Sequence, residues 1–479
     1  MSTTTNTARA RAFAAVDLGA SSGRVIRGLI SPDRLEPAEV HRFPNNPLTG
    51  ADPAGQNPTG QNPTSTVRWD FAALERGARE GLRLAGPVEG IGIDSWAVDY
   101  GLLDAAGALI ANPVHYRDRR TEGVPEQVFA RIPARRLYEI TGIQHQPFNT
   151  VHQLAAARDT AEFKAAARIL MIPDLLAYRL SGVAGTEVTN ASTTGMLDPA
   201  TRSWSAEIAK AVGIDPGMFP PLREPGEPAG IDVDSGTPLF VVGSHDTASA
   251  VAAVPAVDGN FAYISSGTWS LVGVELSAPV LTEASRAANF TNELGVDGTV
   301  RYLRNVMGLW LLQECLRTWH KESELAALLE AAASATARRS VVDAADPVFL
   351  APGDMPARIA KACLDAGQPT PRDEAETVRC ILDSLAETYH SAIEDAARLS
   401  GQRVDVVHIV GGGARNTLLC QLTADATGLP VIAGPEEAAA IGNLLVQARA
   451  ADVIHGGLPE LRSLVARTQP LRRFEPSCG

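Results

Sequence analysis

One carboxylate in this chain stands where an apolar run gives way to polar residues. Val241 and Val242 close a run typical of a buried strand, and the polar segment after it contains His245 and Asp246. Turns rich in glycine and serine lie upstream, at 19–24, and downstream, at 265–268. Such turns can direct N–H groups and hydroxyls at a phosphate. The pattern predicts that Asp246 accepts the proton of a hydroxyl attacking a nucleoside triphosphate. The alternatives are a helix N-cap at Asp246 and a structural role for His245.

The upstream turn follows a strand that ends at Asp17. Two adjacent serines offer hydroxyl donors there, and Arg24 can neutralise charge on a transferring phosphoryl group. Gly19 and Gly23 permit positive φ, which would let backbone amides converge on an oxygen. Asp17 is predicted to hold Mg²⁺ through water, because this hard cation prefers oxygen ligands. The alternative is a plain hairpin turn with a buried aspartate.

The downstream turn, from Ser265 to Thr268, repeats this design between two strand-like segments. Ser-Gly-Thr turns are common between strands, but two such turns at the starts of two α/β units indicate a duplicated, phosphate-holding architecture. A third element, at 408–416, is a strand that enters three glycines and then a helix. It lacks the spacing of a dinucleotide fingerprint. Because glycines have no side chain, the flat ring of an adenosine could lie against this stretch of backbone. The alternative is that the glycines only form a tight turn between the strand and the helix.

The elements expected to position these turns alternate between strands and helices. The predicted strands are a hairpin at 11–30 and single strands at 88–93, 238–242 and 404–410. The predicted helices are 70–84, 301–320, 373–398 and 417–426, with a mainly helical region at 121–235. Alternation in both halves predicts an α/β fold. A chain of 479 residues exceeds one ordinary core, so we expect two domains, 1–255 and 256–479.

The strand at 88–93 leads into Trp96 and Asp99. An aromatic ring can cover the C–H face of a sugar while a carboxylate accepts its hydroxyls. This pair is therefore one candidate for sugar recognition. The alternative is a core tryptophan beside a solvated aspartate.

Bulk properties exclude several classes of function. The net charge of −13 argues against a non-specific nucleic-acid binder, and no segment is apolar for long enough to cross a bilayer. The five cysteines form no CxxC pair, so we expect reduced thiols and no structural zinc. The N-terminal region has no apolar signal core, which predicts a cytoplasmic protein. The duplication GQNPT-GQNPT within 49–66 predicts an exposed loop.

The three turns, in this order and at these separations, resemble those of the FGGY carbohydrate kinases, a family of the actin-like superfamily. The resemblance is carried mainly by AVDLGASSGRV at 15–25, GIDSWAVDYGLLD at 92–104, SHDTASAV at 244–251, YISSGTWSLVG at 263–273, RNVMGLWLLQECL at 304–316 and the stretch 408–438. It implies two actin-like, ribonuclease H-like domains with a central cleft between them. It also implies ATP and Mg²⁺ as cofactors, a small sugar substrate, no nucleic-acid or membrane partner, and a monomer or homodimer.

The resemblance further implies roles for single residues. Asp246 matches the catalytic base, and the implied sugar contacts are Ala97, His245, Asp246 and Thr247. The implied nucleotide contacts are Ala20, Ser21, Ser22, Gly23, Arg24, Thr268, Asn305, Gln313 and Gly412. Ala97 departs from the glycine that many relatives carry there, which leaves the sugar preference open.

Within the family, the resemblance implies transfer of the γ-phosphate of ATP to the 1-hydroxyl of L-rhamnulose. Another ketose, such as L-fuculose or xylulose, is an alternative substrate. An interpretation from a different class is a chaperone-like or binding ATPase on the same fold. The predicted sugar-binding residues argue against this interpretation, because a chaperone-like ATPase would not use them. ATP turnover that does not depend on a sugar would support the interpretation.

Overall fold

The computed structural model describes residues 9–50 and 66–477. Within them the chain forms two compact units. Unit 1 contains the chain up to Ala253 together with Ser277–Val300 and Ala439–Thr468, and unit 2 contains Val254–Leu276, Arg301–Ala438 and the C-terminal segment from Gln469. Unit 1 thus takes in two later segments, which the expectation of domains at 1–255 and 256–479 did not include. The GQNPT duplication lies outside the described residues.

Unit 1 is built on a six-stranded sheet in the order β13-β14-β6-β1-β2-β3. Its strands are β1 (Arg11–Leu18), β2 (Ser22–Ser31), β3 (Arg34–Pro44), β6 (Ile91–Ser95), β13 (Pro228–Ile231) and β14 (Pro238–Phe240). The last six residues of β1 are buried without alternation, as expected for a strand covered on both faces. The hairpin predicted at 11–30 is confirmed, and the parallel strand β6 brings Asp94 beside Asp17.

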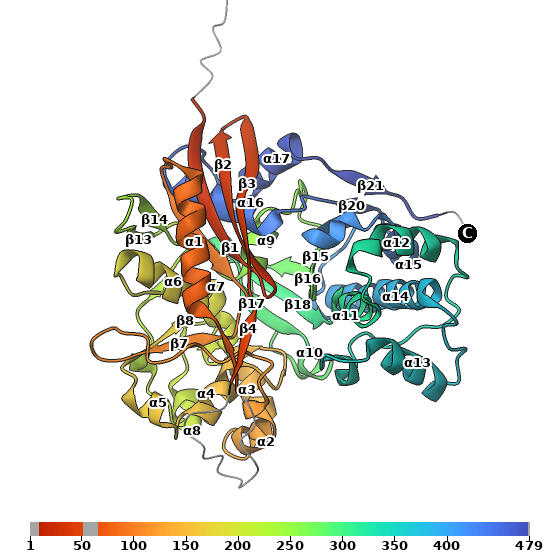
Figure 1. Cartoon of the computed structure of the whole chain (residues 1–479), viewed down its shortest axis with the longest axis horizontal. Coiled ribbons are helices and arrows are strands. Elements are labelled where there is room, and N and C mark those ends of the chain that lie inside the picture. The colour runs from red at the N-terminus through yellow and green to blue at the C-terminus, as the bar shows by residue number, and fades with distance from the viewer. Residues whose placement is uncertain (1–8, 51–65, 478–479) are drawn as a thin grey trace, which may run out of the picture. The chain divides into compact units, whose positions relative to one another are not determined.

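Helix α1 (Phe71–Ala85) covers β1, β2 and β3 (Figure 1). Asp70 caps its N-terminus by accepting the N–H of Ala73 at 2.9 Å, which satisfies one of the unpaired donors of the first turn. Phe71, Leu74 and Ala78 form its buried stripe. This helix agrees with the prediction at 70–84. The prediction succeeded because the capping residue and the spacing of the apolar residues can both be read from the segment itself.

The other helices of unit 1 are α2 (Val124–Phe129), α3 (Ala134–Thr141), α4 (Thr150–Ala157), α5 (Ala161–Ala165), α6 (Ile172–Ser181), α7 (Val188–Ala191), α8 (Ala206–Val212), α9 (Asp246–Ala252), α10 (Glu283–Ala287), α16 (Ala438–Ala450) and α17 (Leu458–Thr468). Short strands join them: β4 (Pro47–Gly50), β5 (Thr66–Trp69), β7 (Tyr100–Leu103), β8 (Arg168–Met171), β9 (Thr186–Glu187), β10 (Leu197–Asp198), β11 (Ser203–Trp204), β12 (Leu222–Arg223) and β17 (Thr291–Leu294). In the described part of the chain, no helix is both long and apolar enough to cross a membrane.

Unit 2 is also built on one main sheet with helices packed against it. Its strands follow one another in the order β18 (Val300–Val306), β16 (Ser270–Leu276), β15 (Phe261–Ser266), β19 (Val406–Val410), β20 (Val431–Ala433) and β21 (Arg472–Phe474). Its helices are α11 (Trp310–Trp319), α12 (Leu325–Ser334), α13 (Met355–Asp365), α14 (Glu374–Ser400) and α15 (Thr417–Thr427). Strand β15 is antiparallel to β16 and parallel to β19, so the mixed α/β class is confirmed.

One predicted element is wrong in its first third. Residues 301–306 belong to strand β18, and only Trp310–Trp319 form a helix. Arg301, Tyr302 and Leu303 are buried, and β18 pairs with β16 in the sheet. Periodicity alone cannot distinguish a strand from a helix in a short apolar run. Residues 301–306 form a strand because they pair with a neighbouring strand of the sheet.

Candidate active site

Asp246 is the first residue of α9, directly after the loop that leaves β14. Its side chain is 34% exposed, whereas the other residues of the segment 241–250 are buried. The N-cap position belongs to His245, whose side chain makes no capping hydrogen bond. The N-cap alternative for Asp246 is therefore wrong, and its carboxylate remains open to solvent.

The residues beside Asp246 are directed at its carboxylate. The hydroxyl of buried Thr247 donates to Oδ1 of Asp246 at 3.1 Å, and Nε2 of buried His245 lies 3.3 Å from the same oxygen. On its other side, Nδ1 of His245 lies 3.2 Å from Oε2 of buried Glu293. Glu293 was not found from the sequence, since nothing in its local pattern connects it to residue 245.

The first turn joins β1 and β2 in a hydrogen-bonded hairpin. The N–H of Gly19 donates to the carbonyl of Ser22 at 3.0 Å, and Asn45 binds the turn through the carbonyls of Gly19 and Ser21. Ser21 is exposed, while Ala20 and Ser22 are half-buried. The tip therefore presents a hydroxyl and small side chains outward, as a phosphate-binding turn requires.

The glycines of this turn do not have the role expected of them. Neither Gly19 nor Gly23 has positive φ. A Cβ at Gly23 would lie 2.2 Å from the ring of Phe43, so close packing against β3 explains the glycine there. The expectation of converging amides at positive φ is wrong for both residues.

Two buried carboxylates lie at the ends of β1 and β6. Asp17 and Asp94 are register partners, and Arg24 donates to Oδ2 of Asp17 at 2.5 Å. Burial, followed by the charges of Asp17 and Asp246, raises the pKa of Asp94 well above its usual range. Oδ1 of Asp94 has no hydrogen-bond partner among the described residues. The carboxyl groups of Asp17 and Asp246 therefore lie close enough to Asp94 for their charges to influence its protonation.

The carboxyl oxygens of Asp17 and Asp94 are the kind of ligand that a hard cation prefers. In the described ranges, no three His, Cys, Asp or Glu side chains come together in a way that could hold a metal ion. A cation here would therefore need water or phosphate for most of its ligands, which is how Mg²⁺ is commonly bound.

The second turn lies in unit 2, between β15 and β16. The carbonyls of Gly267 and Thr268 accept the N–H groups of Leu309 and Trp310 at 3.1 and 3.0 Å, which ties the turn to the start of α11. Asn305 is half-buried in β18, and Gln313 is exposed on α11. Thr268 is itself half-buried. The turn that carries Thr268 is therefore bound to the start of α11, which carries Gln313, and Asn305 lies on β18, which pairs with β16.

The glycine run follows β19 and opens a short 3-10 helix, Gly412–Arg415. Added Cβ atoms at Gly411 and Gly413 would lie 3.0 Å from the carbonyl oxygen and 2.0 Å from the hydroxyl of Ser266. Gly412 is exposed and has no atom within 4 Å of that position. Two glycines thus permit packing against β15, and the third presents bare backbone to solvent.

Asp99 is not a solvated residue, as one sequence interpretation held, but a buried acceptor. Its carboxylate accepts hydrogen bonds from the indole N–H groups of Trp69 and Trp96, the N–H of Tyr116 and the amide of Gln153. The four distances lie between 2.6 and 3.1 Å. Burial raises the pKa of Asp99 to about 6. Asp99 therefore orients two tryptophans, while Ala97 beside them is half-buried.

The predicted site residues divide between the units. Asp17, Ala20 to Arg24, Ala97 and His245 to Thr247 lie in unit 1, and Thr268, Asn305, Gln313 and Gly412 lie in unit 2. In unit 1, Arg24 is paired with Asp17, and both Asp17 and Asp246 are close enough to Asp94 to influence its pKa. The sequence did not single out Asp94 or Glu293, because their contacts with Asp17 and His245 join residues that are distant in the chain.

Comparisons with known proteins agree over nearly the whole length. The chain matches the FGGY family of carbohydrate kinases, with the N-terminal domain at residues 82–251 and the C-terminal domain at 262–451. Rhamnulokinase from Bacteroides thetaiotaomicron is 41% identical, with 97% of this chain and 96% of that protein covered. Rhamnulokinase from Enterococcus faecalis is 38% identical, covering 97% of this chain and 94% of that one.

Solved structures show the same fold at lower identity. Ligand-bound xylulose kinase from Lactobacillus acidophilus matches with a TM-score of 0.77 at 16% identity, covering 97% of this chain and 94% of that one. Glycerol kinase with ADP from Plasmodium falciparum matches with a TM-score of 0.75 at 15% identity, with the same coverage. The actin-like fold expected from the resemblance is confirmed by these matches. Because the family domains cover most of the sequence and full-length relatives share two fifths of its residues, the chain belongs to the FGGY family of carbohydrate kinases.

Proposed function

We propose that this carbohydrate kinase is a rhamnulokinase, which transfers the γ-phosphoryl group of ATP to the 1-hydroxyl of L-rhamnulose. The products are L-rhamnulose 1-phosphate and ADP. The identity of about two fifths to full-length rhamnulokinases supports the choice of sugar. The main structural support for phosphoryl transfer is the carboxylate of Asp246, which is accessible to solvent although the rest of its segment is buried.

In the proposed reaction, Asp246 accepts the proton of the 1-hydroxyl as its oxygen attacks the γ-phosphorus of ATP. Thr247 and His245 contact Oδ1 of Asp246 and orient the carboxylate. Because phosphoryl transfer needs positioning more than covalent chemistry, this orientation would account for much of the rate. The bond that breaks joins the γ-phosphorus to the β–γ bridging oxygen of ATP, which leaves on the β-phosphate of ADP.

The remaining predicted residues handle the phosphates and the nucleotide. Arg24 supplies positive charge near the first turn, and Ala20 to Gly23 and Thr268 supply N–H and hydroxyl donors. Asn305, Gln313 and the bare backbone at Gly412 are proposed to contact the nucleoside. Asp17, together with Asp94, would hold Mg²⁺, which when bound neutralises charge on the phosphates. The cytoplasmic location and the monomeric or homodimeric state stay predictions.

A panel of ketoses tests this proposal. ADP release is measured with L-rhamnulose, L-fuculose, L-ribulose and D-xylulose, each with ATP and Mg²⁺. We expect the highest kcat/KM with L-rhamnulose and a 1-phosphate product by NMR. A higher kcat/KM with another ketose would reassign the substrate, and ATP turnover independent of every sugar would favour a chaperone-like ATPase.

A further inference from the structure

Glu187 is a buried carboxylate that the proposed reaction does not use. It ends strand β9 and caps the short helix α7 that follows it. Its Oε1 accepts the N–H of Thr189 at 2.8 Å, and its Oε2 accepts the N–H of Asn190 at 3.0 Å and the hydroxyl of Thr189 at 2.6 Å. These bonds are local and alone would describe a helix cap.

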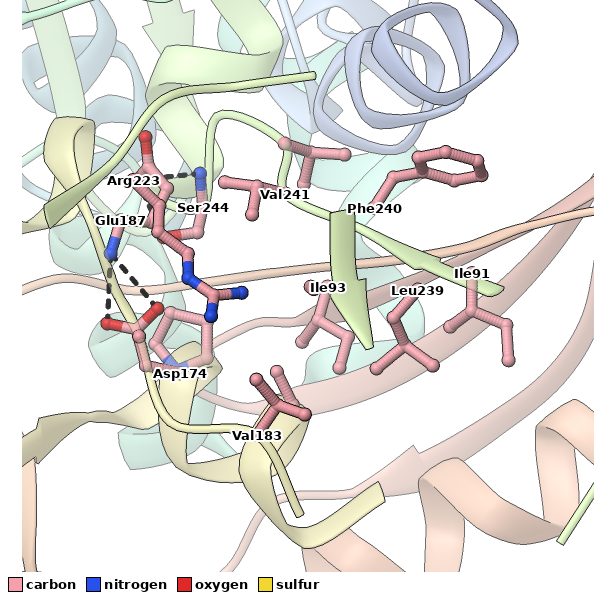
Figure 2. A pocket seen from close by; sticks show the side chains of 15 residues that line it. Ile91, Ile93, Asp174, Val183, Glu187, Arg223, Leu239, Phe240, Val241 and Ser244 are labelled. Atoms are coloured by element: carbon pink, nitrogen blue, oxygen red, sulfur yellow. Dashed lines mark hydrogen bonds between the residues drawn. The ribbon is translucent and has the colours of Figure 1, made fainter. Parts of the chain in front are cut away.

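The same carboxylate also holds a residue 57 positions away. Oε2 of Glu187 accepts both the backbone N–H of Ser244, at 3.1 Å, and its hydroxyl, at 2.8 Å (Figure 2). Ser244 lies two residues before Asp246. Glu187 therefore fixes the segment that delivers the proposed base, and it does so with two charge-assisted hydrogen bonds.

Further bonds complete the support of this segment. The carbonyl of Ser244 accepts the N–H of Ser95 at 2.9 Å, so both backbone polar groups of Ser244 are bound. The N–H of His245 donates to the hydroxyl of Thr189 at 3.4 Å. Residues 187–189 and Ser95 thus hold the backbone that leads into Asp246.

The surroundings of Glu187 make these bonds strong. Ile93, Leu239 and Val241 line one side of the adjoining pocket, and Asp174 and Arg223 lie on the other (Figure 2). The N–H of Glu187 donates to the carboxylate of Asp174 at 3.2 Å. Burial raises the pKa of Glu187, but the groups of Thr189, Asn190 and Ser244 that bind its carboxylate are all donors, as an ionised group needs. Few competing waters reach such a site, so its hydrogen bonds are electrostatically strengthened.

We propose that Glu187 is a positioning residue for phosphoryl transfer, which holds Ser244 and thereby sets the direction of the Asp246 carboxylate toward the sugar hydroxyl. This proposal rests on the proposed function, in which Asp246 is the base. Glu187 touches neither substrate in this scheme and acts through the backbone of residues 244–246.

The main test is Glu187→Gln, which keeps the size of the side chain but places an amide NH₂ among hydrogen-bond donors. We expect kcat with L-rhamnulose to fall by about 10- to 100-fold, the range that a small misplacement of a catalytic group causes. The Kd for ATP and the sugar-independent ATP hydrolysis should stay at wild-type values. Glu207→Gln, at an exposed carboxylate paired with Arg136, is the matched control and should keep wild-type kcat.

A purely structural role would give a different result. It would lower the melting temperature and the fraction of active enzyme, with kcat per active site unchanged, and that outcome would overturn the proposal. Ser244→Ala provides a second variant that removes only one donor. We expect a smaller loss of kcat, and the double variant should be no slower than Glu187→Gln alone because both act through one contact. Additive losses would count against a shared contact.

Asp246→Asn separates this proposal from the proposed function. If wild-type protein shows no L-rhamnulose-dependent turnover, the proposed function fails. If wild-type protein is active, Asp246→Asn is inactive and Glu187→Gln retains full kcat, only the positioning proposal fails.

Discussion

Asn443 donates a hydrogen bond of 2.6 Å to the buried carboxylate of Asp94, from a position 349 residues further along the chain. Asn443 lies on α16, and the next turn of this helix places Gln447, which donates to Oδ1 of Asn443 and to the carbonyl of Ala14. Helix α16 is thereby tied to β6 and to β1 through one buried polar chain. This relationship connects a late segment of the sequence to the carboxylates near Asp246.

Asn443→Ala is expected to destabilise unit 1. Removing the amide leaves Oδ2 of Asp94 without its donor in a buried site, and an unsatisfied buried group costs about 1–3 kcal/mol. The urea midpoint of unfolding measures this cost. Gln127→Ala, at an exposed residue of α2, is the control and should leave the midpoint unchanged. An unchanged midpoint for Asn443→Ala would show that water or a rearranged side chain replaces the bond.

Asp246→Asn is expected to reduce sugar phosphorylation by about 10²- to 10⁴-fold, the usual contribution of a general base. An amide cannot accept the hydroxyl proton at neutral pH, but it keeps the size of the carboxyl group. ATP binding, measured by calorimetry, should be largely intact. Asp258→Asn, at an exposed aspartate, serves as the control. Near-wild-type kcat in Asp246→Asn would remove this residue as the base.

Gly412→Ala and Gly413→Ala are expected to fail in different ways. A methyl group at Gly412 meets open space, so folding should be normal while the KM for ATP rises through contact with the nucleoside. A methyl group at Gly413 would collide with the side chain of Ser266, so the melting temperature should fall. Melting curves and ATP kinetics of both variants distinguish the two effects. A normal KM for ATP in Gly412→Ala would contradict the proposed nucleoside contact.

Asp99 predicts a pH dependence of stability. Its folded-state pKa is about 6, above the ordinary value of 3.8, so the folded state binds this proton more tightly than the unfolded state. The stabilisation is fully present below pH 3.8 and is lost as the pH rises through 6, with a total of about 3 kcal/mol.

Asp99→Asn tests this pH dependence, because an amide does not titrate in that range. The free energy of unfolding should fall less between pH 4.5 and 7.5 in this variant than in the wild type. Other buried carboxylates with raised pKa values, such as Asp94 and Glu187, contribute equally to both proteins and cancel. Asp234→Asn, at an exposed side chain, should show the wild-type slope. If the free energy of unfolding changed equally with pH in all three proteins, Asp99 would not be the source of the pH dependence.

Elements with a complete local signal were predicted well. Helix α14 at Glu374–Ser400 agrees with the prediction at 373–398, and its apolar residues Ile381, Leu385, Tyr389 and Ile393 are buried. The two hairpins with small-residue turns are also confirmed. Residues 301–306 were assigned wrongly, because a buried strand and a buried helix can have the same apolar composition.

The sequence by itself determined the local chemistry of this protein. Apolar runs that end in small polar turns specify the hairpins, and the motifs around Asp17, Asp246 and the glycine run carry the resemblance to the FGGY kinases, because each motif lies within a few consecutive residues. The tertiary structure alone decided which groups hold those residues in place. Glu187 reaches Ser244, Glu293 reaches His245 and Asn443 reaches Asp94 only after strands and helices have packed, since hydrogen bonds between buried side chains depend on distance in space and leave no periodic trace in the chain.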